Sequence, residues 1–314
     1  MRDAVCAAIA AVLLFAAAAP RLGRRLPPTW ATLLLVPASL AMAGSTVFVL
    51  GALAATWLGQ SPAIAALGEW SSARLDATDP VPDPLAAASL VLLAATAGWA
   101  TYRITRRVRA MISMYRTCRE LHASGPVVVL EDDRPDAFAT PAGGIVVTAA
   151  LWHALTKDER RVVLAHERSH VAHRHTWWTF AADLAAAINP LLRPTASAVA
   201  HAVERWADED AAREVGDRNA AARTIARTAL LRHGAAKNAL VPAATGGDVP
   251  QRVRALLAPP PRRNLIALAA LAALLLAGAV ATLAVERTSD ALFDHAALGD
   301  SVGIHSHHDG HEPH

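Results

Sequence analysis

The chain has 314 residues, of which 54% are hydrophobic and only 18% charged, and its formal net charge is +3. The apolar residues are gathered in blocks, which favours a membrane protein over a soluble domain. Two cysteines exclude a disulfide framework. The arginines adjoin apolar blocks and are not interleaved with aromatics, which argues against direct binding of nucleic acid.

Four segments are apolar enough, and long enough or nearly so, to cross about 30 Å of hydrocarbon as helices. These predicted spans are Ala4–Ala19, Trp30–Leu58, Leu85–Tyr102 and Leu265–Val285. The alternative for the first segment is a signal peptide, because it follows Arg2 and ends in small residues. The expected fold class is mainly α, a four-span helical membrane protein.

Charge asymmetry predicts the orientation of the spans, because arginine-rich loops stay in the cytoplasm. Arginines follow the first span and the third span and precede the fourth, whereas the loop 59–84 is acidic. Both termini are therefore expected outside the cell. The lipid bilayer is an expected partner, because all four spans cross it. Residues 103–264 are expected in the cytoplasm.

This pattern divides the chain into a three-span membrane region (1–102), a cytoplasmic domain (103–264), a fourth span (265–285) and an extracytoplasmic tail (286–314). Within the cytoplasmic domain, Pro126–Leu130 is expected to be a short buried strand. Asp136–Thr140 and Ile145–Thr148 are expected to form a hairpin. A helix beginning with the capping box of Thr156 and Glu159 should run to about His175, and a second should cover Ser197–Glu214.

The first of these helices carries the sequence His166-Glu167-Arg168-Ser169-His170, an H-E-x-x-H pattern. Histidines at i and i+4 leave one face of a helix about one turn apart and can bind one metal ion. Glu167 beside them is placed to act as a general base for a water molecule. The pattern predicts metal-assisted hydrolysis.

The third ligand must come from another element. His173 is expected about 10 Å along the helix from His166, and His175 is expected on the opposite side of the helix. Glu204 is the best candidate, because it lies in the middle of the second helix with Asp208 four residues on. Asp208 is placed to hold a ligand histidine through a hydrogen bond.

H-E-x-x-H followed by Glu204-Arg205-Trp206-Ala207-Asp208, with the hairpin ahead of both, resembles the membrane-bound gluzincin metallopeptidases. These include heat-shock membrane peptidases, CAAX prenyl proteases and beta-lactam sensor-transducers, and the four-span arrangement is most similar to the last group. The resemblance implies a cytoplasmic α+β peptidase domain with one zinc ion held by His166, His170 and Glu204. The chain departs from the sensor-transducers in having only about 29 residues after the last span.

The resemblance implies a zinc metalloendopeptidase that cleaves a cytoplasmic or membrane protein, such as a transcriptional repressor in a signalling pathway. The alternatives are a broad-specificity quality-control peptidase and a membrane metal sensor without hydrolytic activity. Residues 145–148 (Ile145, Val146, Val147 and Thr148) are the candidate strand for pairing with an extended substrate. An arginine, His201 or His233 is the candidate oxyanion stabiliser.

The tail after Val285 contains six of the 14 histidines, beginning at His295. Its polar composition predicts disorder, and clustered imidazoles favour binding of an additional transition metal outside the membrane.

Overall fold

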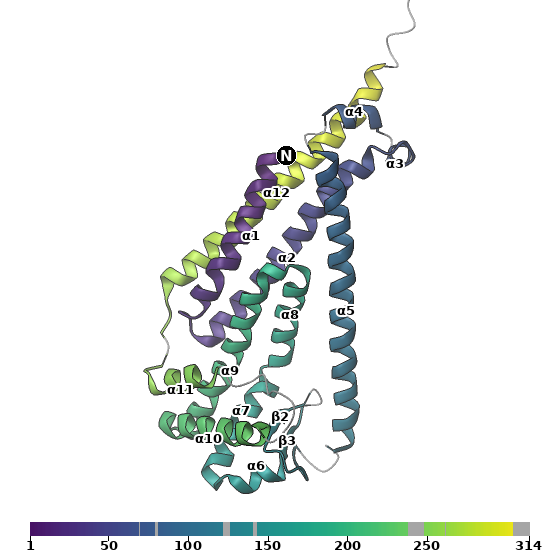
Figure 1. Ribbon diagram of the computed structural model, residues 1–314. Coiled ribbons are helices and arrows are strands. Elements are labelled where there is room, and N and C mark those ends of the chain that lie inside the picture. Colours follow the sequence, from purple (N-terminus) through teal and green to yellow (C-terminus); the bar gives the residue numbers. More distant parts are fainter. Residues whose placement is uncertain are drawn as a thin grey trace, which may run out of the picture.

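The computed structural model describes residues 1–68, 70–78, 81–121, 126–140, 143–237, 248–260 and 262–303. Its helices form a long stem with a mixed helix-and-strand lobe at one end (Figure 1). The predicted fold class is confirmed: the chain is mainly helical, with four candidate membrane spans and one small sheet.

The stem contains the four helices that are long and apolar enough to cross a membrane. They are α1 (Arg2–Gly23), α2 (Pro28–Gly59), α5 (Asp83–Leu121) and α12 (Leu265–Gly303). Each contains one predicted span and extends past it. Helix α1 packs against α12 and α2, and α5 packs against α2. Two short helices, α3 (Pro62–Gly68) and α4 (Ser72–Thr78), lie between α2 and α5.

The predicted disorder after Val285 is wrong for the first part of the tail, because α12 continues as a helix to Gly303. This extension packs against α4, and the ring of Phe293 meets that of Trp70 edge to face at 5.2 Å. Contact with these residues, together with continuation from an already formed helix, stabilises a segment that composition alone would leave disordered. His295 lies in α12, and the other five tail histidines lie outside the described residues.

The lobe contains a three-stranded sheet of β1 (Val127–Leu130), β2 (Ala137–Ala139) and β3 (Ile145–Thr148), in the order β1-β3-β2. Strand β3 pairs in parallel with β1 and antiparallel with β2, which confirms the predicted hairpin. Strand β1 is an exposed to half-buried edge strand, so the prediction of a buried strand there was wrong.

The central position of β3 also overturns the prediction that Ile145, Val146, Val147 and Thr148 pair with a substrate. Both edges of this strand are already occupied by neighbouring strands, and all four residues are buried. A backbone whose hydrogen-bonding groups are already paired cannot add another strand.

The remaining helices of the lobe are α6 (Ala149–Ala154), α7 (Lys157–Ala172), α10 (Arg218–Lys237) and α11 (Val249–Leu257). Helix α7 begins with the predicted capping box, in which Thr156 and Glu159 each bond the other's backbone N–H. An apolar core rich in alanine joins α7, α9 (Arg193–Val215), α10 and α11. Gly216, with φ of 77°, ends α9, since the left-handed region favours glycine.

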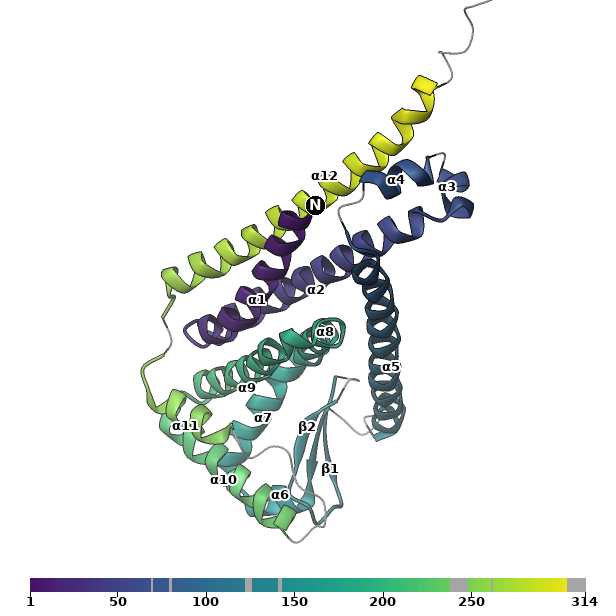
Figure 2. The same cartoon turned by 45° about the horizontal axis from the view of Figure 1, so that its top comes forward.

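A helical hairpin connects the lobe to the stem. Helix α7 ends at Ala172, earlier than predicted, and the left-handed Arg174 (φ 52°) starts α8 (His175–Ile188) in a new direction. A single 3-10 turn, η2 (Pro190–Leu192), then leads into α9. Helices α8 and α9 lie alongside α2 (Figures 1 and 2) and share one apolar core with α1, α2 and α12.

The tip of this hairpin is tied to the middle of α2, where Asn189 Nδ2 donates to Thr46 Oγ1 at 2.9 Å. With 14 residues α8 is too short to cross the bilayer, in agreement with the prediction of four spans. The hairpin therefore connects α9, the helix that holds Glu204, to the candidate membrane spans.

Candidate metal centre

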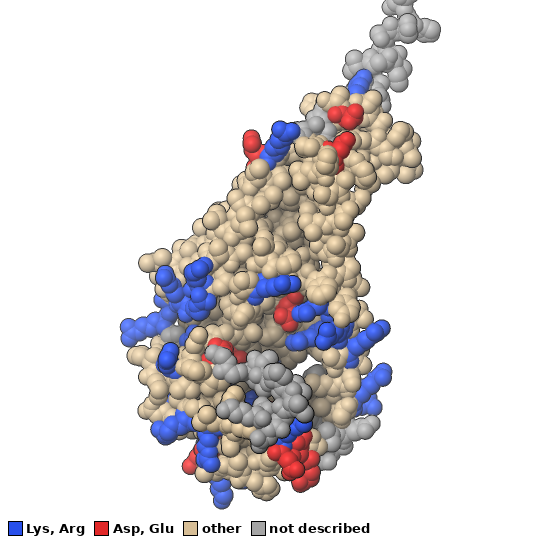
Figure 3. Space-filling model, in the orientation of Figure 1, with Lys and Arg blue, Asp and Glu red and all other residues tan. Residues whose placement is uncertain are grey.

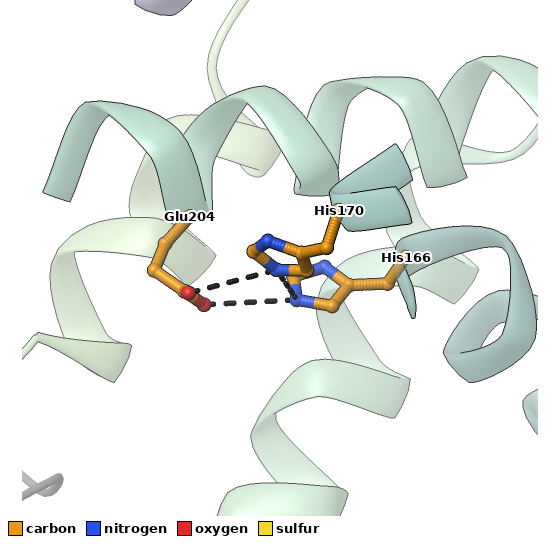
Figure 4. Close-up of side chains that lie close together, drawn as sticks. All are labelled: His166, His170 and Glu204. Atoms are coloured by element: carbon orange, nitrogen blue, oxygen red, sulfur yellow. Dashed lines mark hydrogen bonds and ion pairs between the residues drawn. The ribbon is translucent and has the colours of Figure 1, made fainter. Parts of the chain in front are cut away.

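Three half-buried side chains from two helices converge: His166 and His170 from α7 and Glu204 from α9 (Figure 4). The two Nε2 atoms are 3.1 Å apart, and each lies 3.6 Å from an oxygen of Glu204. Ligands about 2.0–2.1 Å from a tetrahedral zinc ion lie about 3.3 Å from one another. The donor set and its spacing therefore fit a zinc ion.

The helical pairing explains why these residues meet. The i, i+4 spacing puts both imidazoles on one face of α7. Small residues, including Ala165 and Ala211, allow α7 and α9 to approach closely in their shared core. Glu204 then faces the two histidines, as the sequence predicted it could.

The carboxylates behind the site are held by an arginine that the sequence analysis did not identify. Arg252 of α11 places Nη1 2.8 Å from Glu204 Oε2, and it donates to both oxygens of the buried Asp208 at 2.8 and 2.6 Å. Asp208 Oδ1 in turn lies 3.1 Å from His166 Nδ1, which is the position predicted for it. No local pattern marks Arg252, which lies 44 residues beyond Asp208.

These contacts set the protonation of the site. Burial alone would lower the pKa of His166, but its interactions with Asp208 and Glu204 outweigh burial and raise that pKa to about 10. Burial and the neighbouring His166 lower the pKa of His170 to about 4. Burial opposes ionisation of Glu204, but His166 and Arg252 hold its pKa well below the usual range. A metal ion binding here would displace the proton from His166.

Glu167 is buried beside the triad, with 7% of its surface exposed. Burial raises the pKa of its carboxyl, against the opposing effects of His166, Arg232 and a hydrogen bond from the backbone of Ala139. A buried carboxylate with a raised pKa has the properties of a general base that works near neutral pH. The bond to Ala139 also ties Glu167 to the edge strand β2.

The other histidines of this region differ in their position relative to the triad. His173 Nε2 lies 3.0 Å from Asp210 Oδ2, away from the triad. The prediction that His175 points to the opposite side of the helix was wrong: because α7 ends first, His175 Nδ1 comes to 3.0 Å from His170 Nδ1. His201, an oxyanion candidate, pairs through Nδ1 with Asp248 at the start of α11.

The site therefore has the arrangement of a metal-dependent hydrolase: two histidines and a glutamate as potential ligands, with a buried carboxylate beside them.

Comparison with known proteins shows what this region of the chain is similar to. Residues 101–212 match the model of Peptidase family M48. The chain is 44% identical over 70 residues to a protein named Protease HtpX homolog from Syntrophobacter fumaroxidans (strain DSM 10017 / MPOB), covering 19% of this chain and 25% of that protein. It is 45% identical over 67 residues to one of the same name from Acidiphilium cryptum (strain JF-5), covering 20% and 23%. No solved structure matches.

The chain thus spans about a quarter of the length of the curated relatives it matches. The matched region contains the H-E-x-x-H helix, Glu204 and Asp208. Residues 101–212 are similar to peptidases of family M48, and the predicted resemblance to membrane gluzincin metallopeptidases related to the heat-shock peptidases is confirmed. The closer likeness to the sensor-transducers stays a prediction.

Proposed function

We propose that this protein is an integral-membrane zinc endopeptidase with one zinc ion per chain, held by His166, His170 and Glu204. The observation that carries the proposal is the convergence of these three side chains beside the buried Glu167. A zinc ion bound there would polarise the scissile carbonyl and lower the pKa of a water molecule.

Glu167 is the proposed general base. Its carboxylate would take the proton of the attacking water and deliver it to the leaving amine. The raised pKa supports both steps, because a base whose pKa lies nearer the working pH can also return the proton. Asp208 and Arg252 would hold His166 and Glu204 in place.

The outer edge of β2 is the proposed docking strand for an extended substrate. Asp136 and Thr140 bond to β3, so the alternating pattern of an antiparallel pair turns the backbone groups of Ala137 and Ala139 outward. This edge faces the site, since Ala139 bonds to Glu167 and Arg232 donates to Ala137 O at 2.7 Å. A substrate pairing along this edge would have to replace these side-chain contacts and the bond from Ala137 N to Asp136 Oδ1, and it would then lie beside the general base.

The direct test is proteolysis of fluorescently labelled casein by the full-length protein in detergent. The Glu167→Gln variant should retain zinc and lose about 10²–10⁴-fold in rate. Glu214→Gln, which alters an exposed carboxylate paired with Arg168, is the matched control and should cleave normally. Full activity of Glu167→Gln, or a wild-type protein that binds no zinc, would contradict the proposal.

The proposed location is the cell membrane, with the lobe in the cytoplasm and both termini outside. In support of this location, Lys and Arg gather at the end of the stem nearest the lobe and over the lobe itself, whereas the middle of the stem is mostly uncharged (Figure 3). In a Cys6→Ser, Cys118→Ser background, Asp133→Cys should resist an impermeant maleimide in intact cells. Ala77→Cys should react, and the reverse result would invert the topology.

The substrate is proposed to be a cytoplasmic or membrane protein. A single repressor is favoured by the placement of the peptidase region between the third and fourth spans, whereas the names of the relatives say only that they are proteases and leave a broader specificity open. Quantitative proteomics of cells with the wild type or Glu167→Gln separates these cases. One protein stabilised by the substitution supports a dedicated substrate, many support quality control, and none supports a metal sensor without hydrolysis.

A further inference from the structure

His175 belongs to the immediate surroundings of the metal triad, although it lies outside the H-E-x-x-H pattern. The left-handed Arg174 reverses the chain, so the first residue of α8 returns to the face of α7 that carries His170. The imidazole of His175 is 1% exposed, and its Nδ1 lies 3.0 Å from His170 Nδ1. Trp206 and His173 pack against the ring, at centroid distances of 4.9 and 5.6 Å, and hold it in this orientation.

The short distance between the two Nδ1 atoms requires one proton between them. If His170 binds a metal through Nε2, its only proton is on Nδ1, because a ligand imidazole is neutral. His170 is then the donor and His175 Nδ1 the acceptor. His175 must therefore carry its own proton on Nε2.

The surroundings of the other ring nitrogen agree with this arrangement. His170 Nε2 lies 3.1 Å from His166 Nε2 and 3.6 Å from Glu204 Oε1, so it points into the metal triad. The nitrogen that remains for the bond to His175 is therefore Nδ1.

Nothing else among the described residues competes for the tautomer of His175. Its Nε2 is buried and has no hydrogen-bond partner there, so the contact with His170 alone decides which nitrogen carries the proton. The two ligand histidines would then be oriented differently, His166 by the carboxylate of Asp208 and His170 by a neutral imidazole. Orienting partners of this kind commonly change metal affinity by about 10–100-fold.

We propose that His175 is a positioning residue for the metal centre: it accepts a hydrogen bond from His170 Nδ1–H, and so fixes the ring and tautomer of that ligand. This inference rests on the proposed zinc site. Asparagine carries its amide oxygen on Cγ, in the place of the imidazole Nδ1, and can accept the same bond. Leucine fills a similar volume and accepts none.

The test measures zinc affinity by competition with a chromophoric chelator, and the absorption spectrum of bound cobalt(II), in the full-length protein. The five histidines after residue 304 are replaced by glutamine so that only the internal site is measured. His175→Leu should bind zinc about 10–100-fold more weakly and shift the cobalt bands, whereas His175→Asn should stay close to the parent protein. His153→Leu, which removes an exposed imidazole from the last turn of α6, is the matched control.

Equal zinc affinity in His175→Leu and the parent protein would overturn the role of His175 and leave the zinc site intact. Equal weakening in His175→Asn and His175→Leu would also overturn it, because packing would then matter and the acceptor would not. A parent protein that binds no zinc would overturn the proposed function, and this inference with it. Far-UV circular dichroism of each variant identifies any general loss of structure.

Discussion

Replacing Arg252 by methionine should strongly destabilise the lobe in the absence of metal. The substitution removes the hydrogen bonds to Asp208 and the ion pair with Glu204. Among the described residues it leaves Asp208, whose side chain is 2% exposed, with His166 as its one charged partner. Removing one partner of a buried ion pair costs about 3–5 kcal/mol. Because His166 still compensates part of the charge, we expect a loss of about 3 kcal/mol.

Thermal unfolding of the full-length protein in detergent measures this loss. For the lobe, residues 103–264, unfolding as one unit, about 3 kcal/mol corresponds to a fall in melting temperature of roughly 6–12 °C. The matched control is Arg213→Met, which removes a surface ion pair of α9 with Asp210 and should cost at most about 1 kcal/mol. Saturating zinc should reduce the effect of Arg252→Met, since the cation supplies positive charge beside Glu204. Indistinguishable melting of the two variants without metal would refute this reasoning.

Three further predictions concern the helix ends. Thr156→Ala should lower the free energy of unfolding by about 1 kcal/mol through loss of the α7 cap, and an unchanged denaturant midpoint would contradict this. Burial opposes ionisation of Glu159, but hydrogen bonds from Thr156 and Arg227 outweigh it and lower the pKa of the carboxyl. The ionised carboxylate therefore stabilises the folded state at neutral pH, and this contribution is lost as pH falls through that pKa. The loss in free energy of unfolding caused by Glu159→Gln should accordingly become smaller between pH 7 and pH 3. Gly216→Ala should lower the free energy of unfolding by about 1 kcal/mol, because Gly216 has a φ of 77°, whereas Gly234→Ala within α10 should raise it by about 0.5–1 kcal/mol. Melting temperatures equal to that of the parent protein in both variants would contradict both expectations.

Much of the fold could be predicted because its signals are local. The apolar blocks predicted all four candidate spans, and Thr156 with Glu159 predicted the start of α7. The sequence pattern also predicted the β2–β3 hairpin. Failures occurred where a strand or helix depends on its neighbours. Strand β3 became unavailable to substrate because β1 pairs with its second edge, and no pattern within Ile145–Thr148 reports that pairing.

The helix extension after Val285 is a failure of the same kind. Its composition predicts disorder, but packing of α12 against α4 and the contact of Phe293 with Trp70 stabilise it. Composition describes the segment in isolation, whereas these contacts come from residues more than 200 positions away.

At the metal centre, the sequence by itself determined the residues whose relation is a helical repeat. His166 and His170 are one turn apart on α7, and Glu204 and Asp208 are one turn apart on α9, so their spacing alone puts each pair on one helix face. Only the tertiary structure decided what lies behind them. Arg252 reaches Asp208 because α11 packs on α9, and His175 reaches His170 because the chain reverses at Arg174. The physical reason is range: helix periodicity acts over a few residues, whereas the partners that orient the ligands depend on how whole helices pack.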